Sequence, residues 1–410
     1  MNSVPDGPTA SQGAADPAGS ILTLNAGSSS IRFAVFDAAP PAQRRWQGKL
    51  DRLGHADRHL SVQGLKDPQA LAVVMGEIGI DSAEHLVQWL LDSIPEHALR
   101  AVGHRVVHGF SATQPQLIDA GLLANLRSLL RFDPQHLPLE LRLIEAVRER
   151  RPDLRQVACF DTAFHRDMPR VAQMLPIPRR YFARGVRRYG FHGLSFQHLL
   201  TELRHIGDPA VSQGRIVLAH LGGGASVAAV LRGRSIDTSM GLTPTAGLIM
   251  GSRSGDLDPG LVGFLNRTEN MSVDRFQAMV NGESGLLGIS EYSADMRDLL
   301  AQEGCNGQAA DAVEAFCYQA RKWIAAMAAA LGGLDLLVFS GGIGENLPVI
   351  RERICNGLGF LGVGVDAARN AAAEPIISPD LADVRVRVIA SDEERTIATT
   401  VIDMLRPHRP

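Results

Sequence analysis

Cysteine is scarce in this sequence. The 410 residues include four cysteines, at positions 159, 305, 317 and 355, and no two of them stand in a CxxC or other metal-ligand spacing. A long chain with so few cysteines is typical of a reduced, cytosolic protein. We therefore expect free thiols, no disulfide, no zinc site and a cytoplasmic location.

An excess of charge of one sign is also lacking. Lys and Arg total 41 and Asp and Glu total 44, so no diffuse field favours nucleic acid or an anionic membrane as a partner. The most apolar segment, residues 323–339, is interrupted by Gly332, Gly333 and Asp335, which predicts a buried helix and then a buried strand. The sequence predicts no nucleic-acid partner and no membrane partner.

Residues 1–19 lack both a basic start and an apolar core. They therefore do not read as a signal peptide, and we expect a disordered tail. Beyond them, short apolar runs alternate with helical patterns such as residues 81–94 and 139–147, which predicts an α/β fold. At 410 residues the chain exceeds the size at which a single core stops growing, so two domains are expected.

Loops of small residues separate apolar strands at two places. The first is LNAGSSSIRF, residues 24–33, and the second lies within RIVLAHLGGGASVAAVLRG, residues 215–233. A third glycine-rich stretch, SGGIGEN at 340–346, follows the strand-like LDLLVF and precedes the helical run VIRERI. Glycine-rich backbone can wrap a phosphate, and helix N-termini favour anions. The first loop alone could be an ordinary hairpin turn, but the repeated unit and the third loop together favour a nucleotide cleft.

Motifs of the commonest nucleotide-binding classes are missing. The chain contains neither a GxxxxGK[ST] sequence nor an HRD and DFG set, which argues against P-loop proteins and protein kinases.

Eight blocks of the sequence resemble the acetate kinase family, in family order from residue 21 to the C-terminus. They are NAGSSS (25–30), GHRVVHG (103–109), FDTAFH (160–165), RRYGFHG (187–193), HLGGGAS (220–226), DTSMGLTP (237–244), GSRSGDLDP (251–259) and GGIGEN (341–346). The resemblance implies a duplicated two-domain actin-like ATPase (ribonuclease H-like) fold, α/β in class, with a nucleotide cleft between the domains. It also implies a homodimer that reversibly transfers the γ-phosphoryl group of ATP to acetate, giving acetyl phosphate and ADP.

The resemblance assigns four catalytic residues. Arg105 and Arg253 match the arginines that bind the substrate carboxylate and the transferring phosphoryl, and His192 matches a donor to that phosphoryl. Fixed cations and donors are what phosphoryl transfer requires. Asp161 matches an aspartate near the metal, although an Asp-Thr pair is also a common helix N-cap.

The resemblance assigns binding residues as well. The acyl pocket is implied to comprise Arg105, Val107, Gln135, Phe191 and Pro244. Nucleotide contacts are implied for Ser28, Ser30, Arg32, His220, Gly222, Gly223, Gly224, Asp295, Met296, Arg297, Gly341, Gly342, Ile343, Gly344 and Asn346. ATP is the implied co-substrate, with Mg²⁺ or Mn²⁺ associated with Asn25 and Glu393. Ser391 and Glu394 fit an S-x-x-E capping box, so we expect Glu394 to be structural.

Three positions depart from the family pattern. Gly223 stands where the family usually has Asn, which removes an amide donor to phosphate worth roughly 1 kcal/mol. Gln135 stands where the family has an apolar residue, so we expect a partly polar acyl pocket and an acid preference that differs from acetate. His136 matches a second family histidine, but its context is FDPQHLPLE instead of His-Asn-Pro, so its role stays open.

The expected domains are 20–163 with 394–410, and 164–393. The alternatives to acetate kinase are a propionate, butyrate or other short-chain carboxylate kinase, a nucleotide-driven binding module of the actin class, and an inactive paralogue.

Overall fold

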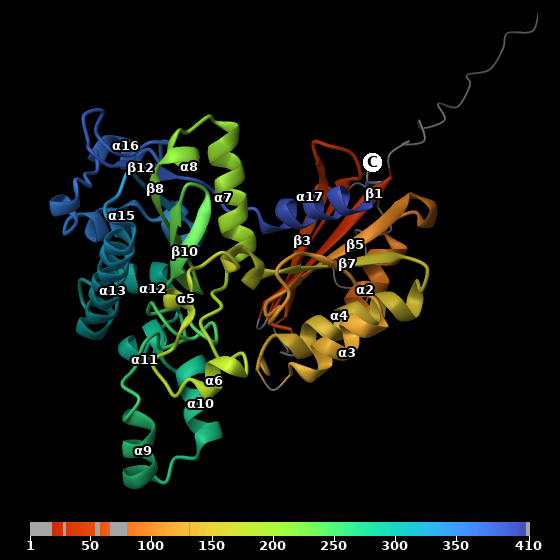
Figure 1. Ribbon diagram of the computed structural model, residues 1–410, viewed down its shortest axis with the longest axis horizontal. Coiled ribbons are helices and arrows are strands. Elements are labelled where there is room, and N and C mark those ends of the chain that lie inside the picture. Colours follow the sequence, from red (N-terminus) through yellow and green to blue (C-terminus); the bar gives the residue numbers. More distant parts are fainter. Residues whose placement is uncertain (1–18, 28–29, 54–57, 66–79, 131, 407–410) are drawn as a thin grey trace, which may run out of the picture.

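The computed structural model describes residues 19–27, 30–53, 58–65, 80–130 and 132–406. It forms two lobes, each built on one β-sheet (Figure 1). Nearly all of the expected N-terminal tail lies outside the described residues, as does Ser28.

The first lobe contains a seven-stranded sheet of order β4-β3-β2-β1-β5-β7-β6. Its strands are β1 (Ser20–Ala26), β2 (Ser30–Asp37), β3 (Arg44–Asp51), β4 (His59–Gln63), β5 (Leu99–Val106), β6 (Gln116–Leu117) and β7 (Arg155–Phe160). Alternate residues of β1 enter different cores: Leu22 packs with helices α2 (Ala83–Asp92) and α4 (Leu137–Arg150), whereas Ile21 packs with α17 (Glu393–Leu405). This two-residue period places a hydrophobic layer on each face of the sheet.

The second lobe contains a five-stranded sheet of order β10-β9-β8-β11-β12. Its strands are β8 (Arg215–Leu221), β9 (Ala225–Leu231), β10 (Arg234–Thr238), β11 (Leu336–Ser340) and β12 (Arg385–Val388). One face packs against α7 (Gly193–His205) and the other against the long helix α13 (Gly307–Leu331). The predicted buried helix and strand within residues 323–339 are therefore confirmed.

The two sheets share one connectivity, which confirms the repeat seen in the sequence. In the first, β1 is antiparallel to β2 and parallel to β5; in the second, β8 is antiparallel to β9 and parallel to β11. Each small-residue loop is the turn of the β1–β2 or the β8–β9 hairpin. The duplicated two-domain α/β fold is thus present, and both hairpin turns lie at the cleft.

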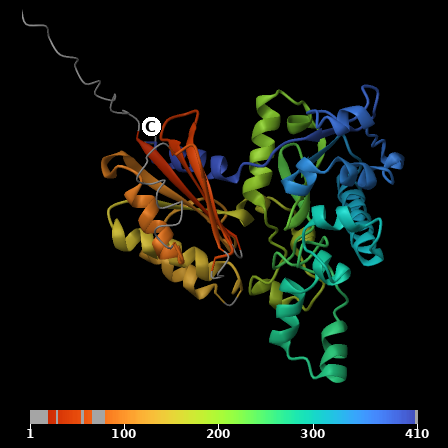
Figure 2. The same cartoon turned by 180° about the vertical axis from the view of Figure 1, so that it is seen from behind.

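Helix α17 returns from the end of the chain to the first sheet. Ile397, Val401 and Ile402 pack among residues of β1, β2, β5 and β7, and Figure 2 shows this blue helix lying along the red strands. The boundaries at 163/164 and 393/394 stay a prediction.

The remaining helices cover the lobes or connect the strands. They are α3 (Ala120–Ser128), α5 (Arg170–Gln173), α6 (Arg180–Ala183), α8 (Ala210–Gln213), α9 (Leu261–Glu269), α10 (Val273–Gly282), α11 (Gly285–Ser290), α12 (Met296–Gln302), α14 (Gly341–Asn346), α15 (Pro348–Cys355) and α16 (Ala367–Ala371), with short 3₁₀ turns at Glu96–Ala98, Asp161–His165 and Gly359–Leu361. Helices α9 and α10 form an arm that projects from the second lobe (Figure 1).

All four cysteines are free, as expected, and three of them are buried. Within the described ranges, no helix combines the length and the apolar character needed to span a bilayer.

Candidate active site

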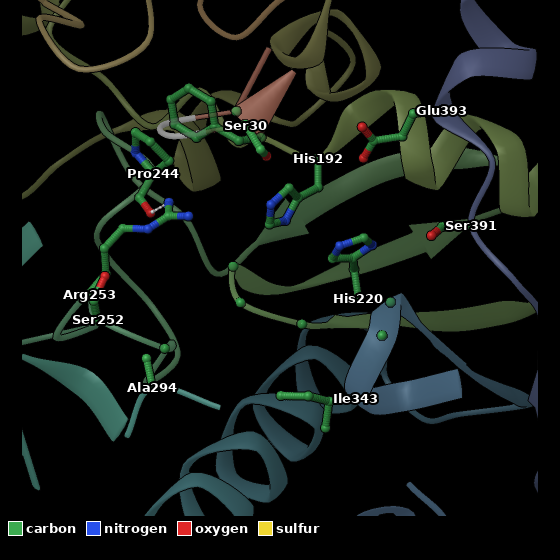
Figure 3. Close-up of a pocket in the computed structure, with 18 of the residues that line it drawn as sticks. Ser30, His192, His220, Pro244, Ser252, Arg253, Ala294, Ile343, Ser391 and Glu393 are labelled. Atoms are coloured by element: carbon green, nitrogen blue, oxygen red, sulfur yellow. Dashed lines mark hydrogen bonds between the residues drawn. The ribbon is translucent and has the colours of Figure 1, made fainter. Parts of the chain in front are cut away.

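A cleft of about 960 Å³ lies where the hairpin turns of both sheets meet the start of α14. Most of the residues that the sequence assigned to the site line this cleft, from Asn25, Ser30 and Arg32 in the first hairpin to Glu393 at the start of α17. Figure 3 shows His192 and His220 side by side in it, with Arg253 on one side and Glu393 on the other. The structure thus brings together side chains separated by more than 350 residues of sequence.

Arg105 projects from β5 and is held by carboxylates. Its Nε and Nη2 both donate to Asp161 Oδ2, at 3.1 and 2.6 Å, and Nη1 donates to Asn25 Oδ1 at 3.2 Å. Burial acts to lower the pKa of Arg105, but the charges of Asp161 and Glu393 outweigh it and raise that pKa above its usual value. Arg105 is therefore a permanent cation with a fixed orientation.

Asp161 does not line the cleft; it lies completely buried behind Arg105. The 3₁₀ turn Asp161–His165 makes no side-chain cap bond, so the N-cap alternative for Asp161 is wrong. Burial raises the pKa of Asp161 against the opposing effect of Arg105. Its Oδ1 is buried without a hydrogen-bond partner, which leaves one acceptor available.

Arg253 has a different environment. Its Nη1 donates to the Pro244 carbonyl at 2.7 Å, and no ion pair is recorded for it in the described part of the chain. Burial and repulsion from Arg105 lower the pKa of Arg253 to about 10. A partly buried cation without a carboxylate partner is a ready site for an anion.

His192 stands at the N-terminus of α7 in the left-handed conformation, with φ of 58°. This backbone costs a non-glycine residue about 1 kcal/mol or more and is characteristic of functional positions. Its Nδ1 lies 2.9 Å from Ser226 Oγ. Burial lowers the pKa of His192 well below its usual value, helped by His220 and the two arginines, so the ring is neutral.

Two glycines allow the close approach that this arrangement needs. A Cβ on Gly224 would lie 2.8 Å from Arg253 Nη2 and 3.1 Å from His192 Nε2, which places both donors beside the turn of the second hairpin. A Cβ on Gly193 would lie 1.8 Å from the Asp161 carbonyl oxygen. Glycine is therefore required at 193, whereas a side chain at 224 would displace Arg253.

The second hairpin presents backbone to the cleft through Gly222, Gly223 and Gly224, and His220 beside them is fixed by a 2.8 Å contact between its Nδ1 and Ser195 Oγ. A Cβ on Gly223 would meet no atom within 4 Å, so a side chain has room there.

We expect Gly223→Asn to lower KM for ATP by up to about tenfold, because an amide donor reaching phosphate contributes on the order of 1 kcal/mol. Gly223→Ala is the matched control, since it adds the Cβ without the amide. Steady-state kinetics with varied ATP provides the measurement. An asparagine variant that binds ATP no better than the alanine variant would contradict the prediction.

The third glycine segment is helical, not a loop as the sequence suggested. Gly341–Asn346 forms α14, whose first residues face the cleft. Glu345 secures it: Oε1 accepts from Gly341 N at 2.8 Å and from Ser391 N at 2.9 Å. Gly344 is buried and does not line the cleft, whereas Gly341, Gly342, Ile343 and Asn346 do.

The predicted adenine-flanking segment lines the same cleft. Asp295 Oδ1 accepts from Arg297 N at 2.9 Å and caps α12. Met296 is buried in the second core, whereas Arg297 is exposed and pairs with Asp295.

Four side chains form what we call the acyl wall: Val107, Gln135, Phe191 and Pro244. Val107, Phe191 and Pro244 are buried, but Gln135 is exposed. His136 also lines the cleft.

Asn25 joins the first hairpin to α17. Its Nδ2 donates to Glu393 Oε2 at 2.8 Å and to Glu394 Oε1 at 2.9 Å. The predicted capping box is therefore wrong: Asp392 is the N-cap of α17, accepting from Arg395 N at 3.0 Å. Glu394 instead approaches Asn25, while Ser391 bonds Glu345.

The residues near Glu393 fit a magnesium ion. Mg²⁺ takes oxygen ligands, keeps several waters and uses one or two carboxylates together with substrate phosphates. Burial opposes ionisation of Glu393, but Arg105, His220 and Asn25 lower its pKa below the usual value, and both Glu393 and Asn25 line the cleft. Within the described ranges no cluster of three or more ligand-type side chains could hold a metal alone, so phosphate and water would complete its shell.

Sequence reasoning missed Glu345, Ser391, Gly251, Ser252, Asn281 and Ala294, which line the cleft. The sequence GGIGEN contained a signal for Glu345, because an acidic side chain just after a run of glycines can accept hydrogen bonds from their backbone amides. Nothing local marked Ser391 as a partner of Glu345.

Comparisons with known proteins identify the family of this chain. The model of the Acetokinase family matches residues 20–399. The chain is 43% identical over 390 residues to the acetate kinase of Rhodopseudomonas palustris (strain TIE-1), covering 93% of this chain and 97% of that protein. Its fold matches a propionate kinase from Francisella tularensis with a TM-score of 0.83 at 33% identity, covering 93% of this chain and 98% of that one. It matches the Porphyromonas gingivalis acetate kinase with a TM-score of 0.81 at 32% identity, over 95% and 100% of the two chains. Because the family model matches residues 20–399 and these relatives share sequence and fold over most of both chains, the chain belongs to the acetokinase family.

Proposed function

We propose that this protein is an acetate kinase that reversibly transfers the γ-phosphoryl group of ATP to acetate, giving acetyl phosphate and ADP. The observation that carries the proposal is the convergence of Arg105, Arg253 and neutral His192 in one cleft, lined by two hairpin turns and the glycine-rich start of α14. Family membership supports the same reaction.

A carboxylate acceptor suits this set of residues. At neutral pH the acid is already ionised, so the reaction needs no general base, and fixed positive charge is the main requirement. One carboxylate oxygen attacks the γ-phosphorus, the bond to the bridging oxygen breaks, and ADP leaves with the electron pair. Arg253 and Arg105 hold the carboxylate and the equatorial oxygens in line.

His192 supplies a neutral donor at the same point. With Ser226 donating to Nδ1, the ring presents its Nε2–H beside Gly224, where the transferring phosphoryl would lie. Asp161 keeps Arg105 oriented, and Asn25 orients Glu393. Glu393, with Asn25 beside it, would hold Mg²⁺ or Mn²⁺ through oxygen, and the bound metal would supply charge neutralisation on the phosphates.

ATP would lie across the turns of the β1–β2 and β8–β9 hairpins and the start of α14. In this proposal Ser30 and Arg32 contact phosphate from the first hairpin, together with Ser28. His220 and Gly222–Gly224 contact it from the second hairpin, and Gly341–Ile343 with Asn346 approach the adenosine. Asp295, Met296 and Arg297 would flank the adenine.

The primary test mixes purified protein with ATP, Mg²⁺ and acetate, propionate or butyrate and traps acyl phosphate as the hydroxamate. Acid-dependent hydroxamate is expected, and the rank order of rates identifies the preferred acid. No product with any acid, from folded protein that binds ATP, would overturn the proposal. A preference for propionate would favour the alternative activity, propionate kinase, which is the name of the Francisella relative.

Gln135 is the residue of the acyl wall expected to influence acid preference. Gln135→Leu should raise kcat/KM for acetate and propionate relative to glycolate by about 3- to 10-fold, because the amide can hydrogen-bond the hydroxyl of glycolate whereas leucine offers only apolar surface. The measurement is kcat/KM for the three acids. Gln116→Leu is the control, since Gln116 is exposed on β6 and does not line the cleft. Unchanged ratios would show that Gln135 does not select the acid.

We also propose a homodimer in the cytoplasm. Helix α9 has no buried residue, and the arm that it forms with α10 exposes Phe264 and Val273. Apolar side chains that project in this way are typical of a partner-binding surface. The four free thiols suit a reducing compartment.

A further inference from the structure

A carboxylate and a histidine are paired at the start of α4, next to the acyl wall. Asp133 Oδ1 lies 2.9 Å from His136 Nδ1 and accepts from His136 N at 3.2 Å. His136 lines the cleft. Asp133 does not line it, and only 4% of its surface is exposed. Within the described residues His136 Nε2 has no hydrogen-bond partner and is not among the buried unpartnered atoms. Because His136 lines the cleft, this end of the ring faces it.

Two buried carboxyl groups here have opposite pKa shifts. Burial acts to raise the pKa of Asp133, but the bonds and charge of His136 lower it below its usual value. Burial and the charge of Asp133 raise the pKa of Glu140 well above its usual value. Such divergence assigns the charge to one group and a proton to the other, so Asp133 is the anion and Glu140 the neutral acid.

Holding this charge is costly for the fold. Asp133 Oδ2 is buried without a partner, as are Glu140 Oε2 and His108 Nε2 nearby. Buried polar atoms without partners are rare and call for an explanation other than stability. The charge of Asp133 also acts on Arg253, whose pKa it raises against the effect of burial, so Asp133 lies within electrostatic range of Arg253.

We propose that Asp133 is a positioning residue whose carboxylate accepts the Nδ1–H of His136 and pairs with the imidazolium form of the ring, so that Nε2–H donates to the carboxylate of the acid substrate at the acyl wall. The inference rests on the proposed function and adds a specific pair of residues to it. Accepting the Nδ1–H makes Nε2 the free end of the ring, in the manner of the aspartate of a catalytic triad. The bond from His136 N also allows a simpler role, in which Asp133 only stabilises the turn before α4.

Asp133→Asn separates these roles, because the amide keeps the size and the acceptor for His136 N but loses the charge. We expect kcat for acyl phosphate synthesis to fall about 10- to 100-fold, the usual effect of losing an orienting partner, with KM for ATP unchanged. His136→Ala should fall at least as far. The double variant should be no slower than His136→Ala, because Asp133 acts through His136.

Asp119→Asn is the matched control. Asp119 Oδ1 caps α3 by accepting from Leu122 N at 2.7 Å and lies on the exposed surface, so this variant should lower Tm slightly and leave kcat intact. His136→Asn keeps a donor near Asp133 and removes the free end of the ring; it should fold and lose kcat, which tests the pair even if Asp133→Asn does not fold.

Full kcat in Asp133→Asn or in His136→Asn, or independent effects that multiply in the double variant, would overturn the inference. A wild-type protein that makes no acyl phosphate would instead overturn the proposed function, so the two failures are distinguishable.

Discussion

Replacing Arg253 with alanine is expected to reduce acyl phosphate synthesis by about a thousandfold or more. The loss of one preorganised donor commonly costs 10²–10³ in kcat, and an arginine on a transferring phosphoryl contributes 10³–10⁵. Arg253 combines both roles, because its guanidinium faces Gly224 beside His192 Nε2. The hydroxamate assay at saturating ATP and acid measures the effect.

The same substitution should not weaken the fold. Burial and Arg105 already lower the pKa of Arg253 to about 10, so the fold gains little from this cation. We expect Tm of Arg253→Ala to equal or exceed that of the wild type, which is typical where function costs stability. Arg142→Ala, which breaks an exposed ion pair with Glu84, is the control and should retain activity. An Arg253→Ala protein with near-normal turnover would remove Arg253 from the mechanism.

Gly193→Ala is expected to have the largest structural effect, destabilising the protein by more than about 3 kcal/mol and abolishing activity. An added Cβ would lie 1.8 Å from the Asp161 carbonyl oxygen. The position of a Cβ is fixed by the main chain and the oxygen is part of it, so no side-chain rotation can relieve the overlap. The first turn of α7 would have to move away from the turn that carries Asp161. His192, which precedes Gly193, would move with it.

Denaturant unfolding and the hydroxamate assay test this prediction together. Gly304→Ala is the matched control, since a Cβ there meets nothing within 4 Å. Stability of Gly193→Ala within about 1 kcal/mol of the wild type would show that the two segments can separate at little cost.

The fold was predictable to the extent that local pattern governs it. The apolar runs on either side of the glycine loops predicted both hairpins, and the helical spacing at 81–94 and 139–147 predicted α2 and α4. The expectation of a loop at GGIGEN was wrong because its residues can close one helical turn, held by Glu345 at the first amide. The capping box was wrong because Asp392, and not Ser391, is the N-cap residue of α17 and accepts a hydrogen bond from the amide of Arg395.

The site was predictable as a set of residues and not as a set of contacts. The motifs identified Asn25, Arg105, Asp161 and Glu393, yet the bond from Asn25 to Glu393 joins positions 368 residues apart. No local pattern contains such a pairing. Asp133 was missed for a similar reason: it was visible only as part of an unusual context for His136, and its meaning depends on burial.

The duplicated hairpins have become unequal in what they demand of mutation. The β1–β2 hairpin contributes side chains to the cleft, from Asn25 in β1 and from Ser30 and Arg32 in β2. Its chemistry therefore depends on which residues stand at these positions. The turn of β8–β9 consists of glycines and presents only main chain to the cleft, so any substitution there adds volume. A Cβ on Gly224 would approach Arg253 and His192, whereas a Cβ on Gly223 would meet no atom within 4 Å. A substitution at Asn25 would therefore remove a functional group that bonds Glu393, whereas a substitution at Gly224 would add atoms where none fit.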